Sequence, residues 1–302
     1  MEIIKWGTKI DFVVKMKLCF ALSLALIVLS IASVVYHGGL NYGIDFAGGT
    51  LVQVRFQQHP EIEVIRRALR PLHLEGSIIQ QVGEKEVIIR TAQSSSALKG
   101  LDSHIAEALS SVFGKGAVEI RRVEVVGPKV GKDLTRKAIL AIIFSWLGML
   151  VYISWRFEFR YAVGGILALI HDTIITVGAL SLLNKEFTLT IVAALLTIIG
   201  YSINDTIVVY DRIRENVRKG IKKDLGEIIN LSINETLSRT ILTSFTVFLV
   251  LVALFFFGGE VIHDFAFALL VGVVVGTYSS IYIASPIVLA WERVRPSRIK
   301  RK

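Results

Sequence analysis

The sequence predicts a helical membrane protein with six transmembrane helices and one α+β ferredoxin-like (βαββαβ) domain outside the cytoplasm. Three observations support this fold class. Hydrophobic residues make up 53% of the chain, and the mean hydropathy of +0.61 is too high for an ordinary soluble domain. Six segments are long and apolar enough to cross a bilayer, which takes about 20 residues. A much more polar stretch, residues 37–133, separates the first of these segments from the second.

The predicted spans cover residues 17–36, 138–155, 161–183, 188–210, 240–258 and 265–290. The first is too long and unbroken for the core of a signal peptide, and no small-residue cleavage site follows it. We therefore interpret it as a retained span. The only cysteine, Cys19, lies in this span. A disulfide within the chain and a cysteine-based metal site are thereby excluded.

Lysine and arginine in the short connections predict how the chain is oriented, because cytoplasmic loops carry an excess of positive charge. Four basic clusters fall on one side of the membrane if the spans alternate, whereas the opposite short connections, 184–187 and 258–264, contain only Lys185. Both termini and the loop 211–239 are therefore expected in the cytoplasm. The clusters consist of Lys5, Lys9, Lys15 and Lys17; Arg156 and Arg160; Arg212, Arg214, Arg218, Lys219, Lys222 and Lys223; and Arg293, Arg295, Arg298, Lys300, Arg301 and Lys302.

This orientation divides the chain into three parts and places it in the cytoplasmic (inner) membrane. Residues 1–36 form the cytoplasmic N-terminus and the first span, and residues 37–133 form the extracytoplasmic domain. Residues 134–302 form the other five spans, with the basic loop 211–239 and a basic tail. The net charge of +9 is compatible with nucleic-acid binding. Since the basic residues flank apolar segments, we expect membrane lipid as a partner and no nucleic acid.

The extracytoplasmic domain shows the strand and helix order of a ferredoxin-like fold. Alternating apolar and polar residues indicate strands, and apolar residues at helical spacing indicate two amphipathic helices. The expected order is a strand at 51–56, a helix at 60–70, strands at 77–82 and 86–91, a helix at 96–113 and a strand at 118–126.

Two glycine-rich stretches flank this domain, and we interpret both as links that couple it to the membrane helices. GIDFAGG, residues 43–49, has a ligand loop as its alternative, and its Asp45 can satisfy backbone N–H groups at a turn. VGPKVGKDL, residues 126–134, resembles a phosphate-binding loop but lacks the required spacing and the Ser or Thr after its lysine, so a hinge is favoured. The coupling residues are Gly43, Asp45, Phe46, Gly48, Gly49, Gly127, Pro128 and Gly131.

Asp205 lies inside the fourth predicted span, where an ionised acid costs roughly 2.5–3.5 kcal/mol unless it is paired, protonated or facing a cavity. Thr197, Tyr201 and Asp205 recur at four-residue spacing, with Asn204 adjoining, so we expect one polar stripe facing the interior of the helix bundle. Arg239, at the start of the fifth span, lies at a similar depth. An Asp205–Arg239 pair is therefore predicted. A static ion pair is the alternative to a functional one, and apolar residues serve a static role equally well.

His171 and Asp172 lie near the middle of the third span. Intramembrane ionisable groups mark functional sites by default, which favours a proton relay. Local hydrogen bonding to neighbouring helices is an equal alternative. No third ligand is spaced for a metal site, and no metal or other cofactor is expected.

The sixth span carries small residues at strict four-residue spacing: Gly272, Gly276, Ser280 and Ala284. This pattern lets helix backbones approach closely, so we expect a packing face, within the bundle or with a partner chain. Pro286 is expected to kink the end of this helix.

Six motifs together resemble the SecF family. They are GIDFAGGT (43–50), VGPKVG (126–131), HDTIITVG (171–178), GYSINDTIVVYDRIREN (200–216), NETLSRTILTS (234–244) and GTYSSIYIASP (276–286). They occur in the right order over nearly the whole chain. The resemblance implies a half-transporter of the resistance-nodulation-division (RND) superfamily that pairs with SecD. It also places the family's membrane acid on Asp205 and its membrane arginine on Arg239.

The resemblance implies a function in protein export. With SecD and the SecYEG translocon, the chain would use the proton gradient to help a translocating preprotein across the membrane. Half of a proton-driven RND-type small-molecule exporter is the alternative, and a purely structural assembly factor is a third hypothesis. No Ser/His/Asp set, HExxH motif or pair of outer acids indicates an enzyme.

Overall fold

The computed structural model describes residues 10–74, 76–91, 100–220 and 224–294, without the side chains of residues 260 and 261. It divides into two compact units, a membrane unit of residues 1–41 with 140–302 and an outer unit of residues 42–139. Some predicted features lie outside the described residues. They are the basic residues Lys5, Lys9, Lys222, Lys223, Arg295, Arg298, Lys300, Arg301 and Lys302, and the predicted helix start at Ser96.

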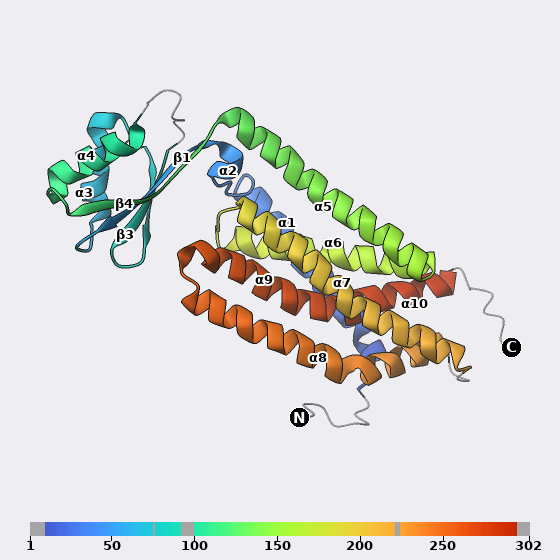
Figure 1. Ribbon diagram of the computed structural model, residues 1–302. Coiled ribbons are helices and arrows are strands. Elements are labelled where there is room, and N and C mark those ends of the chain that lie inside the picture. The colour runs from blue at the N-terminus through green and yellow to red at the C-terminus, as the bar shows by residue number, and fades with distance from the viewer. Residues whose placement is uncertain (1–9, 75, 92–99, 221–223, 295–302) are drawn as a thin grey trace. The chain divides into compact units, whose positions relative to one another are not determined.

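Six helices in the described part of the chain are long and apolar enough to cross a membrane. The chain is therefore a multi-pass membrane protein, as its hydropathy predicts. The helices, shown in Figure 1, are α1 (Phe12–Tyr36), α5 (Pro128–Arg156), α6 (Phe159–Leu182), α7 (Leu189–Arg218), α8 (Leu225–Phe257), and α9 (Glu260–Ser279), which continues through a π-helical turn (Ser280–Ala284) into α10 (Ser285–Val294).

Three of these spans form the centre of the membrane unit. In the most apolar windows of α6, α7 and the α9–α10 helix, 56–61% of residues are buried, against 11–17% in α1, α5 and α8. Helix α7 packs against α6, α8 and α9. The polar residues expected to carry function lie on or beside these central helices, while the other three spans expose most of their apolar side chains.

A π-helical turn interrupts the sixth span just before the expected proline kink. Pro286 has no N–H for the helical ladder. Two backbone carbonyls of the preceding turn also accept hydrogen bonds from side-chain hydroxyls. The Ser285 hydroxyl donates to the carbonyl of Ser280 at 3.0 Å, and the Tyr210 hydroxyl donates to the carbonyl of Ala284 at 3.2 Å. The irregularity thus falls in the turn before Pro286, where a side chain of α7 stabilises it.

The basic loop expected at 211–239 is largely helical. Helix α7 continues to Arg218, and α8 begins at Leu225, capped by the Asp224 carboxylate, which accepts from the N–H of Glu227 at 2.7 Å. The two helices therefore extend beyond their apolar segments. At their ends the Asn216 side chain donates to the Ser232 hydroxyl at 3.0 Å and to Glu235 at 2.7 Å.

The outer unit has the ferredoxin-like topology predicted from the sequence. Its elements are α2 (Ile44–Ala47), β1 (Gly49–Phe56), α3 (Ile62–Leu69), a 3₁₀ turn (Arg70–Leu72), β2 (Ile78–Val82), β3 (Glu86–Thr91), α4 (Leu101–Phe113) and β4 (Val118–Val126). The strand order is β2-β3-β1-β4, and all neighbours are antiparallel. Alternate residues of β1 and β3 pack against α3 and α4, which cover one face of the sheet (Figure 1).

Candidate functional site

Asp205 is buried in the membrane unit, with 3% of its surface exposed. Its carboxylate accepts a hydrogen bond from the Ser244 hydroxyl of α8 at 3.2 Å. The hydroxyls of Tyr201 and Thr277 lie 3.3 and 2.7 Å from Ser244 Oγ. The acid therefore ends a short chain of hydroxyl groups contributed by α7, α8 and α9.

The direct ion pair predicted between Asp205 and Arg239 is not formed. No ion pair within 4.0 Å joins these two described residues, although the charge of Arg239 acts on the carboxylate. Arg239 is exposed at the surface of the chain, whereas its neighbour Thr240 is buried. The sequence did not predict the direction of Arg239 around α8, because packing fixes helix rotation.

The polar stripe of α7 was expected to face the bundle interior. Only part of it does so. Thr197 and Asn204 are exposed, Tyr201 is half-buried, and only Asp205 is buried. Thr197 and Asn204 lie seven residues apart, which is about two helical turns, so both fall on the same exposed face of α7. The stripe thus lies at the boundary between the core of this chain and its surface. With Arg239 it forms an exposed polar strip, defined here as Thr197, Asn204 and Arg239.

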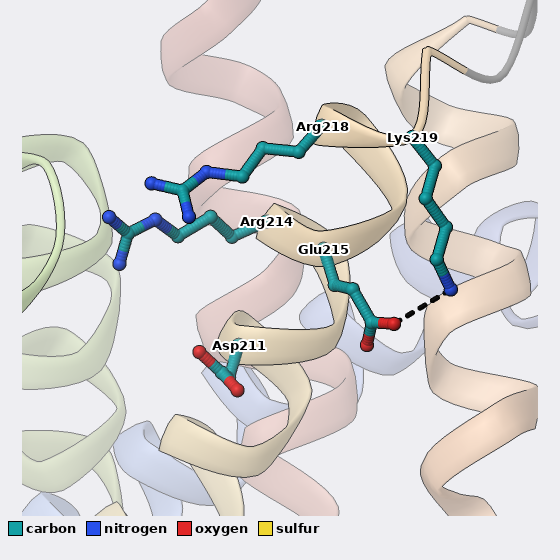
Figure 2. A pocket seen from close by; sticks show the side chains of 5 residues that line it. All are labelled: Asp211, Arg214, Glu215, Arg218 and Lys219. Atoms are coloured by element: carbon teal, nitrogen blue, oxygen red, sulfur yellow. Dashed lines mark ion pairs between the residues drawn. The ribbon is translucent and has the colours of Figure 1, made fainter.

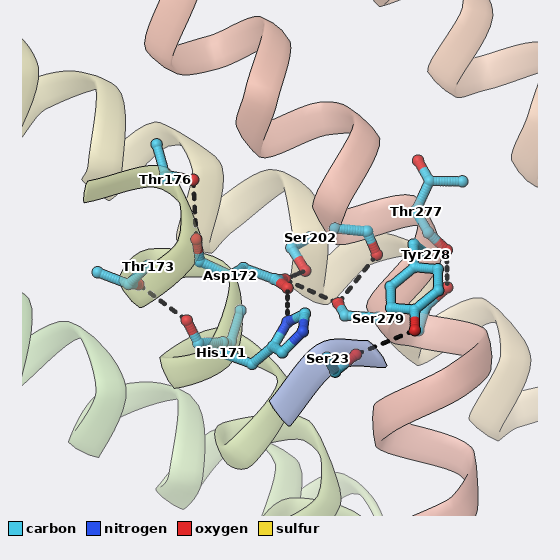
Figure 3. A network of polar contacts seen from close by, with 12 residues as sticks. Ser23, His171, Asp172, Thr173, Thr176, Ser202, Thr277, Tyr278 and Ser279 are labelled. Carbon is cyan, nitrogen blue, oxygen red and sulfur yellow. Dashed lines mark hydrogen bonds and ion pairs between the residues drawn. The ribbon is translucent and has the colours of Figure 1, made fainter. Parts of the chain in front are cut away.

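Asp172 forms a second, separate polar centre on α6, as Figure 3 shows. One carboxylate oxygen accepts from the Ser202 hydroxyl of α7 at 2.6 Å and from the Ser279 hydroxyl of α9 at 2.8 Å. The other lies 2.8 Å from Nδ1 of His171. All four residues are buried. Three donors therefore satisfy this acid, which is the condition under which a buried carboxylate is tolerated.

The two ring nitrogens of His171 differ in their hydrogen bonding within the described part of the chain. Nδ1 lies 2.8 Å from the Asp172 carboxylate, whereas Nε2 has no hydrogen-bond partner among the described residues and the side chain is almost fully buried. The ring stacks on Tyr278, with centroids 6.2 Å apart. The Tyr278 hydroxyl donates to the backbone carbonyl of Cys19 at 2.6 Å and lies 3.0 Å from the Ser23 hydroxyl (Figure 3).

The two acids lie on different helices, but the hydrogen bonds around each of them involve residues of both α7 and α9. Ser202 and Asp205 lie one turn apart on α7, and Thr277 and Ser279 lie two residues apart on α9. Each centre therefore holds α7 and α9 together. A shift of α9 along α7 would disturb both. The sequence revealed the two acids and the histidine, but not the serines and threonines around them, whose only signal is polarity inside apolar spans.

The small residues of the sixth span pack within the bundle rather than against a partner chain. A side chain at Gly272 would collide with Ile198, and a Cβ at Gly276 would lie 2.9 Å from Cβ of Ser202. Ser280 is buried and donates to the carbonyl of Thr277 at 2.9 Å. Close approach of α9 to α7 requires these glycines.

The two glycine-rich links contact each other in the outer unit. A Cβ at Gly131 would lie 2.6 Å from the carbonyl oxygen of Phe46, and one at Gly48, where φ is +76°, would lie 3.1 Å from Cα of Pro128. The hinge predicted at 126–134 is helical from Pro128 onward. Proline suits the first position of a helix, because its missing N–H has no partner there in any case. Asp45 lies in the first turn of α2, and Gly43, Gly49 and Gly127 flank the contact.

The described residues contain no group of three or more His, Cys, Asp or Glu side chains that could hold a metal ion. The groups present at the two centres are carboxyl, imidazole and hydroxyl groups. Such groups bind, hold and release protons.

Comparison with known proteins identifies the family. The chain is 50% identical over 293 residues to the protein translocase subunit SecF of Magnetococcus marinus, which covers 96% of this chain and 94% of that relative. It is 46% identical to the same subunit of Calditerrivibrio nitroreducens, over 98% of both chains. This chain belongs to the SecF family. Its family members are subunits of the Sec protein-export machinery.

Other matches agree with this SecF assignment. Residues 105–294 match the family described as protein export membrane protein SecD/SecF, C-terminal, and residues 36–58 match the SecD/SecF GG motif. The crystal structure of SecDF, a translocon-associated membrane protein from Thermus thermophilus, is 39% identical with a TM-score of 0.84. SecDF in its super-membrane-facing form gives a TM-score of 0.70. The matches cover 96% and 98% of this chain, which spans 40% of the length of each SecDF chain.

Proposed function

We propose that this SecF-family chain pairs with a SecD-type partner and uses the proton gradient to help the Sec translocon move proteins across the cytoplasmic membrane. The observation that carries the proposal is a buried acid, Asp205, inside a transmembrane helix with one hydroxyl group, that of Ser244, as its hydrogen-bond donor. An acid in this setting is costly when ionised. Binding a proton removes that cost, so the protonation state of Asp205 controls how α7 packs.

The exposed polar strip supports a position for the partner. Thr197, Asn204 and Arg239 lie at transmembrane depth but are exposed at the surface of this chain. Polar groups at such depth face protein or a water-filled cavity rather than lipid. We infer that the SecD-type half covers this strip and brings Arg239 and Asp205 into one interface. The match to SecDF, of which this chain spans 40%, supports an assembly with a second half.

Proton movement supplies enough free energy for this mechanism. One charge crossing the membrane field gains about 2.3 kcal/mol per 100 mV. A two-state element whose states differ by a few kcal/mol responds to a bias of that size. Protonation of Asp205 weakens its interaction with Arg239, and α7 and α9 then repack together with the Asp172 centre. Helix α5 runs continuously from the Gly131 contact into the membrane unit, and we propose that it carries this motion to the outer domain.

The proposed orientation follows the distribution of basic residues. Both termini and the 211–239 region lie in the cytoplasm, and the 37–133 domain lies outside, where the emerging preprotein passes. We propose SecYEG and the preprotein as further partners of this chain. A reporter fused after Arg293, or inserted at Gly114, decides the orientation by its accessibility from each side.

Substitution of Asp205 by Asn tests the proton role. The amide keeps the size and the hydrogen bond from Ser244 but cannot take up a proton. We expect D205N to assemble with its partner and to abolish the proton-dependent stimulation of preprotein export in membrane vesicles.

Asp205→Glu is the matched control, because it keeps a protonatable group, and it should retain part of the stimulation. Normal stimulation by D205N would reject the proposal. Loss of assembly in D205N with full stimulation by any residual complex would assign Asp205 a structural role instead.

A further inference from the structure

The far end of α7 carries two arginines without ion-pair partners among the described residues. Arg214 and Arg218 lie one helical turn apart and extend to the same side of α7, as Figure 2 shows. Their neighbours are paired: Arg212 binds Glu215 and Glu235 at 2.5 and 2.7 Å, and Lys219 binds Glu215 at 2.7 Å. Two cations therefore remain available on this face of the helix.

These arginines line a surface cavity of about 370 Å³, together with Asp211, Glu215 and Lys219. Arg214 is held in place by the end of α5, where its guanidinium donates to the carbonyl of Arg156 at 3.1 Å. The guanidinium carbons of Arg156 and Arg214 lie 5.2 and 5.8 Å from the ring centre of Phe157. Arg156 Nη2 also lies 3.6 Å from Asp211 Oδ1. The fixed position of Arg214 leaves the rest of its guanidinium, and that of Arg218, directed at the cavity.

The cavity lies at the depth of lipid headgroups. The apolar part of α7 ends at Tyr210, so Arg214 lies ~6 Å beyond it at ~1.5 Å per residue. The headgroup layer is about 5–7 Å thick on each side of the hydrocarbon core. Arg218 is one turn further out, and arginine side chains of that length reach back to the interface.

Aromatic residues mark the same boundary. Trp155 is 85% exposed and directly precedes Arg156. Phe159 is 57% exposed, and its ring meets that of Trp291 with centroids 6.1 Å apart. Exposed tryptophan at helix ends is typical of the membrane–water interface.

We propose that Arg214 and Arg218, beside the end of α5, bind the phosphate headgroup of an anionic phospholipid in the leaflet at this end of α7. Basic pockets between transmembrane helices take such headgroups, and the guanidinium fork matches a phosphate in a bidentate manner. A free phosphate ion offers the same headgroup chemistry but makes no use of the aromatic boundary. The proposal does not depend on the proton role of Asp205.

Native mass spectrometry of the delipidated full-length chain tests the site, with phosphatidylglycerol and phosphatidylcholine as probes. Each arginine near an anionic surface contributes about fivefold to binding. We expect R214Q/R218Q to bind phosphatidylglycerol about 30-fold more weakly than the wild type. Arg218→Gln alone, which breaks no described hydrogen bond or ion pair, should lose about fivefold and guards against misfolding of the double variant.

The matched control is K15Q/K17Q, which removes two positive charges from the same end of the bundle. Both lysines are exposed near the start of α1, where the N–H of Phe12 donates to Asn230 of α8 at 2.8 Å. This control should bind phosphatidylglycerol like the wild type. Equal losses in both double variants would reduce the effect to overall charge and overturn the site. Equal binding of phosphatidylcholine, or displacement by inorganic phosphate, would overturn it as well.

Discussion

Individual residues decide how charge is tolerated in this membrane unit. Asp172 has three donors and lies at the contact of three helices, whereas Asp205 has one hydroxyl donor and lies beside the surface of the chain. The first arrangement stabilises an ionised acid in one geometry. The second leaves the acid free to change partners. Of the two, we therefore assign the exchange of protons to Asp205, and to Asp172 the joining of α6, α7 and α9.

Asp172→Asn tests this division of roles. The amide group presents N–H to one of three donors, and a buried donor without an acceptor costs about 1–3 kcal/mol. We expect D172N to lower the free energy of unfolding in detergent by that amount. Asp211→Asn, an exposed acid on α7, should change it by less than about 0.5 kcal/mol. A D172N chain that keeps full stability but loses export would instead make Asp172 and His171 a proton relay.

Individual residues also show which parts of the site could be predicted from the sequence. Asp205, Asp172 and His171 stand out because ionisable groups are rare in apolar spans. Ser244 and Ser279 do not, because membrane helices tolerate hydroxyls that bond to their own backbone carbonyls. The predicted ion pair between Asp205 and Arg239 is not formed for a different reason. Sequence spacing gives the depth of Arg239, but the face on which it lies depends on how α8 packs.

At the scale of elements, the α7–α9 contact depends on the absence of side chains. Gly272 and Gly276 let the backbones approach, and the serines that bind Asp172 come from the same two helices. The four-residue spacing predicted this packing face, since small residues at that spacing have one physical use in a membrane helix. It did not predict which helix is the neighbour, because every span is apolar enough to be one.

Gly276→Ala tests the contact. The added methyl would lie 2.9 Å from Cβ of Ser202, so α7 and α9 must separate and the bond from Ser202 to Asp172 lengthens. We expect a loss of about 1–3 kcal/mol in the free energy of unfolding. Gly200→Ala is the control, because no atom lies within 4 Å of a Cβ at that position of α7. The hypothesis fails if the two variants unfold alike.

At the scale of the whole molecule, the chain combines a bundle that holds buried acids with a small sheet domain. The ferredoxin-like order was predicted correctly because each strand and helix carries its own periodicity and the loops are short. The beginning of α5 was not, because the hydropathy of the predicted span starts at 138 while helical hydrogen bonding starts at Pro128. The glycine-rich links therefore meet as a packed contact rather than as a loose hinge.

Gly131→Ala tests whether that contact carries motion. Its methyl would lie 2.6 Å from the carbonyl oxygen of Phe46, whereas Gly127 has no atom within 4 Å. We expect G131A to assemble with its partner but to lose most export stimulation, and G127A to behave like the wild type. Equal stimulation by both variants would remove the links from the mechanism.

The exposed polar strip has one more consequence. If a SecD-type half covers this strip, as proposed above, a copy of this subunit made without it would present an amide and a guanidinium to hydrocarbon, and the bilayer would pull thin or admit water around them. Such a defect distinguishes a solitary copy from an assembled one without any dedicated signal.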